Sequence, residues 1–153
     1  MIDEGLRHPR AADEMRRGHL FWKLTGRYRI ANLEKILRYD YSDLDLVINI
    51  RRLPKKWSDL YLYGFDHAAW TKLIANIDRF KETGEETITE RTMYFVIETL
   101  MRERSLRIAT RLPFEPHIVG IRGWDNREYD SGVQRLKRHV RQALRVIAPG
   151  LHV

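Results

Sequence analysis

The sequence predicts a single α+β domain over residues 1–153, in which a small antiparallel or mixed sheet of about four strands packs against several helices. The chain has the length of one ordinary domain, and its 43% apolar content is enough for a buried core. Stretches that alternate apolar and polar residues are interspersed with stretches at helical spacing, and no repeat or flexible linker divides them. We expect residues 1–9 to form a loose N-terminal arm and residues 149–153 a short tail.

The first part of the chain predicts two helices. Pro9 suits the first turn of a helix over residues 10–24. Asp13 and Glu14 lie early in that helix, where the dipole favours acids. After an interruption by glycine, residues 31–39 predict a short second helix with one apolar face.

An antiparallel pair of strands is predicted next. Apolar and polar side chains alternate over residues 43–51, and Val47 alone breaks the polar half. This pattern is typical of a strand buried on one face. Residues 57–65 alternate again after RLPKK at 52–56, so we expect the two strands to pair through that turn.

The next segments predict two helices and two short strands. Asp66 is a good N-cap for a helix over residues 67–84. Residues 89–103 fit a helix preceded by a capping box, and their Thr and β-branched content fits a strand almost as well; we choose the helix. Strands are predicted within residues 105–112 and 117–121.

The last predicted helix, residues 131–150, is strongly basic. Its apolar residues form one stripe, and five Lys/Arg fall outside that stripe. No Asp or Glu lies within residues 131–148 to balance them. The sequence therefore predicts a helix with an apolar underside and a basic outer face.

Two acids, Asp43 and Asp45, lie in the segment SDLDLVI of the first predicted strand. Side chains at i and i+2 of a strand point to one face, so both carboxylates could reach one divalent metal ion. The segment resembles the strand of the nucleotidyltransferase fold, and that resemblance implies a metal-dependent enzyme that uses Asp43 and Asp45. The upstream LEKILRYDY, however, lacks the Gly-Ser turn with which that family holds nucleotide phosphates. A structural role, in which the acids face Arg or Lys neighbours across the sheet, is favoured.

Other catalytic motifs are missing from the sequence. Cysteine is absent, which excludes disulfides, thiolate nucleophiles and Cys-based zinc or iron–sulfur sites. The histidines show no H-E-x-x-H spacing, the serines lie in no G-x-S-x-G motif, and neither a dinucleotide fingerprint nor a P-loop occurs. We therefore expect a non-enzymatic protein without a cofactor.

The basic residues carry the leading functional hypothesis. The net charge is +7, with nine Lys/Arg against five Asp/Glu in residues 1–38 and eleven against five in residues 101–153. The residues expected to bind an anion are Arg135, Arg138, Arg141, Arg145, Arg51, Arg52, Lys55 and Lys56. The expected aromatic contacts are Trp57, Trp22 and Tyr28, although core or dimer packing is favoured for Trp22. We predict a homo-oligomeric binding protein that recognises an anionic partner, above all the RNA or DNA backbone.

Two other partner classes stay open. Basic residues beside exposed Trp or Leu suit an acidic membrane surface, as in a virus- or phage-encoded matrix-like structural protein that also contacts a nucleocapsid. An inhibitor or adaptor that binds another protein is the third class. No stretch approaches the roughly 20 apolar residues that span a bilayer, and the N-terminus lacks a secretory signal. We expect a cytoplasmic protein, the cytoplasm of a host cell included.

Overall fold

The computed structural model describes residues 13–14, 17, 19–25, 28–53, 55–82 and 90–120, with the backbone alone for residues 79–82. It confirms the α+β fold class and the mixed sheet of about four strands. In chain order the elements are β1 (Phe21–Leu24), β2 (Arg29–Ile30), α3 (Leu33–Leu37), β3 (Leu46–Arg51), β4 (Trp57–Phe65), α4 (His67–Glu82), α5 (Glu90–Glu103), β5 (Ile108–Ala109) and β6 (Ile118–Val119).

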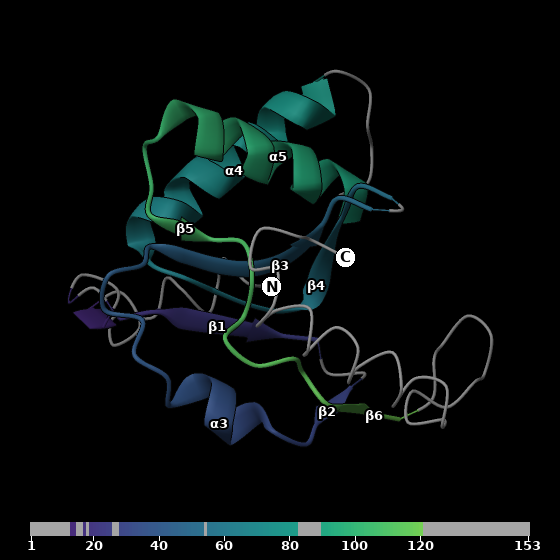
Figure 1. Cartoon of the computed structure of the whole chain (residues 1–153). Helices are drawn as coiled ribbons and strands as arrows, with labels where there is room; N and C mark the ends of the chain where they lie inside the picture. Colours follow the sequence, from purple (N-terminus) through teal and green to yellow (C-terminus); the bar gives the residue numbers. More distant parts are fainter. Residues whose placement is uncertain are drawn as a thin grey trace.

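The main sheet has the strand order β1-β4-β3-β5. Strand β4 runs antiparallel to both β1 and β3, whereas β5 runs parallel to β3. Strands β2 and β6 form a separate antiparallel ribbon. In Figure 1, α4 and α5 lie over one face of the main sheet, and α3 and the ribbon lie on its other side. The sheet is therefore covered on both faces.

Strand β3 is buried on both faces, so the prediction of a strand buried on one face is wrong. Leu46 and Ile48 pack in a core cluster with residues of α4 and α5. Val47, which breaks the polar half of the sequence pattern, belongs to a second cluster that includes Leu112. Asn49 also lies on that side, is only 5% exposed, and its Oδ1 accepts a hydrogen bond from the Leu112 backbone N–H at 2.7 Å.

Residues 21–24 form strand β1, so the helix predicted over residues 10–24 is wrong for this part. β1 pairs with β4 along its whole length. Phe21 packs against the first core cluster and Trp22 against the second. Successive strand residues point to opposite faces, and this alternation places the two aromatic rings in different cores.

The other expected elements are largely confirmed. Strands β3 and β4 form the predicted antiparallel pair. Asp66 caps α4, because its Oδ1 accepts a hydrogen bond from the Ala69 backbone N–H at 2.8 Å. The helix chosen for residues 89–103 is α5, which buries its apolar side against β4 and α4. The segments predicted as the last two strands contribute only the two-residue strands β5 and β6.

Several predictions lie outside the described residues: the N-terminal arm, the basic helix over residues 131–150 and the C-terminal tail. In the described part of the chain, none of the helices has the length and apolar character needed to cross a bilayer.

Candidate nucleic-acid interface

The β3–β4 hairpin places the second predicted basic cluster at one end of the sheet. The strands pair as far as Arg51 and Trp57, so residues 52–56 connect them. Around this turn Arg52, Lys55 and Lys56 are exposed. The first predicted cluster, which consists of Arg135, Arg138, Arg141 and Arg145, lies outside the described residues.

Arg51 differs from its basic neighbours because it is half-buried and paired with a carboxylate of its own chain. Its Nη2 donates hydrogen bonds to both carboxylate oxygens of Asp59, at 2.9 and 3.0 Å. The Tyr61 hydroxyl donates to Asp59 Oδ2 at 3.3 Å. Burial lowers the pKa of Arg51, but the charge and hydrogen bond of Asp59 outweigh it and leave that pKa raised. Arg51, which the sequence analysis predicted to bind an external anion, is therefore already paired with the Asp59 carboxylate.

One exposed cation of the hairpin, Lys56, lies beside two aromatic rings of α5. Lys56 Nζ is 5.8 Å from the Tyr94 ring centroid and 5.6 Å from that of Phe95. The guanidinium of Arg91 is 5.8 Å from the centroid of the same Phe95 ring. Cations at such distances from an aromatic ring are attracted by its quadrupole. The turn and the start of α5 thus form one surface, which Figure 1 shows side by side.

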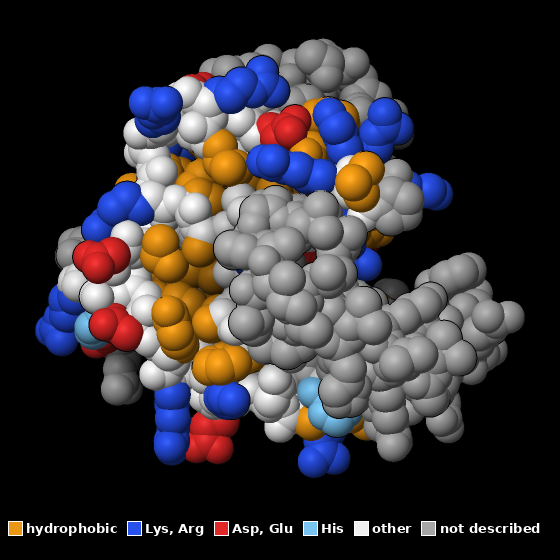
Figure 2. Space-filling view, viewed as in Figure 1, with side chains coloured by type: hydrophobic (Ala, Val, Ile, Leu, Met, Phe, Trp, Pro, Cys, Tyr) orange, Lys and Arg blue, Asp and Glu red, His pale blue; other side chains and the backbone are white. Residues whose placement is uncertain are grey.

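We call Arg52, Lys55, Lys56 and Arg91 the hairpin cluster. The Arg52 guanidinium donates a hydrogen bond to the Tyr94 hydroxyl oxygen. The same hydroxyl donates a hydrogen bond to Glu98 Oε1 at 2.7 Å. Burial and then the Glu98 carboxylate raise the pKa of Tyr94, whereas Arg52 lowers it. Figure 2 shows Lys and Arg side chains gathered over this end of the molecule, in the upper right of the view.

Trp57 is the one of the three predicted aromatic contacts whose ring is exposed on the surface. It is 37% exposed and flanks the turn. Trp22 lies against Gly64 and meets the Tyr41 ring edge-on at 5.0 Å, which agrees with core packing. Tyr28 is half-buried and packs edge-on against the Tyr61 ring at 6.3 Å.

The acids Asp43 and Asp45 precede β3 and do not lie on it. Asp45 accepts hydrogen bonds from Arg107 Nε at 3.0 Å and from the Arg107 backbone N–H at 2.7 Å. Asp43 is fully exposed, with Oδ1 4.0 Å from Arg107 Nη1. The side-chain hydrogen bond of Arg107, above all, holds the pKa of Asp45 below its usual value. Both acids thus have Arg107 as a basic neighbour, but these contacts lie before β3 and not across the sheet as expected. Among the described residues, no group of three or more His, Asp or Glu is arranged to hold a metal ion.

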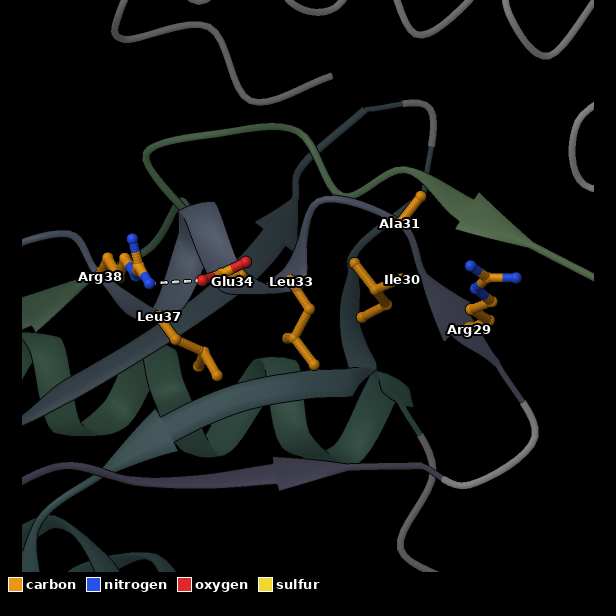
Figure 3. A pocket seen from close by; sticks show the side chains of 7 residues that line it. All are labelled: Arg29, Ile30, Ala31, Leu33, Glu34, Leu37 and Arg38. Atoms are coloured by element: carbon orange, nitrogen blue, oxygen red, sulfur yellow. Dashed lines mark ion pairs between the residues drawn. The ribbon is translucent and has the colours of Figure 1, made fainter.

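A shallow groove beside α3 was not predicted from the sequence. It has a volume of about 480 Å³ and is lined by Arg29, Ile30, Ala31, Leu33, Glu34, Leu37 and Arg38. In Figure 3 the apolar side chains of Ile30, Leu33 and Leu37 project toward the same side. Arg38 at one end is paired with Glu34 at 2.5 Å. Leu37 belongs to the apolar face predicted for the helix over residues 31–39, and its 41% exposure leaves it on the surface.

Comparison with known proteins adds no relative: no protein-family model, curated protein or solved structure matches this chain.

Proposed function

We propose that this protein is a non-enzymatic binding protein that holds the backbone of RNA or DNA through the hairpin cluster. The observation that carries the proposal is the concentration of four exposed cations on one turn and the adjoining helix end. Each phosphate that a Lys or Arg neutralises releases condensed counterions, and this release supplies most of the affinity of sequence-independent binding.

Ion pairing distinguishes the hairpin cluster from several other arginines. Among the described residues, five arginines outside the cluster form ion pairs with carboxylates: Arg17–Glu14, Arg38–Glu34, Arg51–Asp59, Arg102–Glu98 and Arg107–Asp45. Within the same part of the chain, no member of the hairpin cluster lies within ion-pair distance of a carboxylate. An external anion that approaches these four exposed side chains would meet their combined positive field.

The test is a binding assay with mixed-sequence RNA and DNA at low salt. The cluster variant replaces three cations of the turn with glutamine: Arg52→Gln, Lys55→Gln and Lys56→Gln. We expect the wild-type protein to bind and the cluster variant to bind far more weakly. No detectable binding of either nucleic acid by the wild-type protein would refute the proposal.

A matched control separates local contacts from net charge. The control variant removes three exposed cations that belong neither to the turn nor to the contacts around Tyr94: Arg29→Gln, Arg38→Gln and Arg104→Gln. Both variants lose the same charge, so a general electrostatic attraction would weaken equally in both. A specific interface at the hairpin predicts a large loss in the cluster variant and a small one in the control.

An acidic membrane surface is the second candidate partner, and exposed apolar residues of the same hairpin favour it. Leu53 is 57% exposed and Trp57 37% exposed, beside Lys55 and Lys56. An apolar side chain and an indole next to cations suit the interface of an anionic bilayer. Flotation with phosphatidylserine-containing vesicles tests this candidate, with pure phosphatidylcholine vesicles as the control. Absence of co-flotation with the acidic vesicles would remove it.

A further inference from the structure

We infer that the nucleic acid held at the hairpin is single-stranded, with a base stacked on Trp57 and the flanking phosphates on the turn cations. This inference rests on the proposed function and names its substrate class. It follows from where the indole lies relative to the cations and from the free face that an unpaired base presents to it.

The strand register places the indole and the cations on different sides of the same turn. Trp57 lies directly opposite Arg51, and cross-strand partners project to the same face. Arg51 reaches Asp59 on that face, which is the side away from α5. Lys56, one residue before Trp57, reaches the α5 rings on the opposite side. A flexible strand that crosses the turn can therefore meet cations on one side and an aromatic plane on the other.

A duplex offers the indole no partner. Its bases are stacked on one another and present no free face to Trp57. A duplex would therefore meet the turn cations through its phosphates alone and leave Trp57 unused.

Unpaired bases, in contrast, have an open face for the indole. Stacking of one base on an aromatic side chain changes affinity by about 5- to 140-fold when the ring is replaced by alanine. Such stacking tolerates any base, because every base has a π-face. The site is thus expected to bind single strands with little sequence preference.

The experiment compares a labelled mixed-sequence 20-nucleotide single strand with a blunt duplex of the same length. Wild-type protein should bind the single strand more tightly. Trp57→Ala should weaken single-strand binding by about 5- to 140-fold and change duplex binding less than twofold. Trp57→Phe should keep most of the affinity, because it retains a ring. Leu53→Ala, in the same turn, is the matched control and should leave the affinity within twofold.

The outcomes separate this inference from the proposed function. Equal or tighter binding of the duplex by the wild-type protein overturns the single-strand inference, and this comparison needs no variant to fold. Single-strand binding that is unchanged in a folded Trp57→Ala variant overturns it as well. In both cases the proposed function stands if the cluster variant still loses affinity. Failure of the wild-type protein to bind either nucleic acid overturns both, and binding to acidic vesicles alone would identify the partner as a membrane surface.

Discussion

Replacing Arg51 with glutamine should weaken the fold and leave nucleic-acid affinity nearly unchanged. Arg51 is the cation of the turn region whose charge is already held by Asp59. An exposed ion pair contributes about 0–1 kcal/mol, whereas removing one partner of a buried pair costs about 3–5 kcal/mol. The side chains are 35% and 7% exposed for Arg51 and Asp59, so the pair lies between these limits. We expect a loss of about 2 kcal/mol in the free energy of unfolding.

Thermal unfolding and a binding assay together measure this effect. A loss of that size lowers the Tm by about 4–8 °C for a chain of this length. Lys55→Gln is the matched comparison, because Lys55 is exposed and lies in the same turn. It should leave the Tm unchanged and weaken binding. An Arg51→Gln variant with an unchanged Tm and an affinity as low as that of Lys55→Gln would refute the assignment of Arg51 to the ion pair with Asp59.

Three further substitutions test the packing. Arg107→Gln should destabilise the fold at neutral pH, because Arg107 lowers the pKa of Asp45 and a lowered carboxyl pKa contributes stability while the group is ionised. The difference in the free energy of unfolding between this variant and the wild-type protein should therefore shrink as the pH falls below about 4. Urea unfolding from pH 7 to 2 measures it, and a difference that stays constant with pH would contradict the ion pair. Gly64→Ala should cost about 1–3 kcal/mol, because the new Cβ would lie 3.0 Å from Cε2 of Trp22; an unchanged urea midpoint would show that the indole lies elsewhere. Asn49→Ala should also lower the free energy of unfolding by about 1–3 kcal/mol, because the buried backbone N–H of Leu112 loses its acceptor. A loss below about 0.5 kcal/mol would contradict the burial of this hydrogen bond in the second core.

The elements that the sequence predicted well depend on local signals. Strand β4 shows its alternation within nine residues, and the Asp66 cap lies immediately before α4. β1 was predicted as helix because Asp13, Glu14 and Pro9 are helix-start signals. Its strand conformation comes from pairing with β4, whose residues are about 40 positions away in the sequence. Tertiary pairing of this kind overrides local propensity.

The second core was missed for the same reason. The residues that cover this face of β3 come from α3 and from Leu112, which are distant in the sequence and carry no shared periodicity. Val47 was the one local signal, since an apolar residue at a polar position of an alternating strand indicates cover on both faces. Asn49 looked like a surface residue because its hydrogen-bond partner, the Leu112 backbone, cannot be inferred from composition.

The candidate site was predicted in part. The exposed turn cations lie on the connection between two strands, and Trp57 begins the second strand, as the sequence predicted. Strand alternation could have separated Arg51 from Arg52, because Arg51 shares a face with Asp59 across the hairpin. The contribution of Arg91 required the structure, since α5 follows the turn by more than thirty residues and is brought to it only by packing.

The salt dependence of binding tests the central claim most directly. For a single strand, log Kd changes with log salt concentration by about 0.7 per phosphate contact, so the four cations of the hairpin cluster contribute a slope of up to about 3. Removing three of them in the cluster variant should lower the slope by about 2, whereas the control variant should keep the wild-type slope. A cluster variant whose slope equals that of the wild-type protein would show that the hairpin makes no phosphate contacts and would contradict the account.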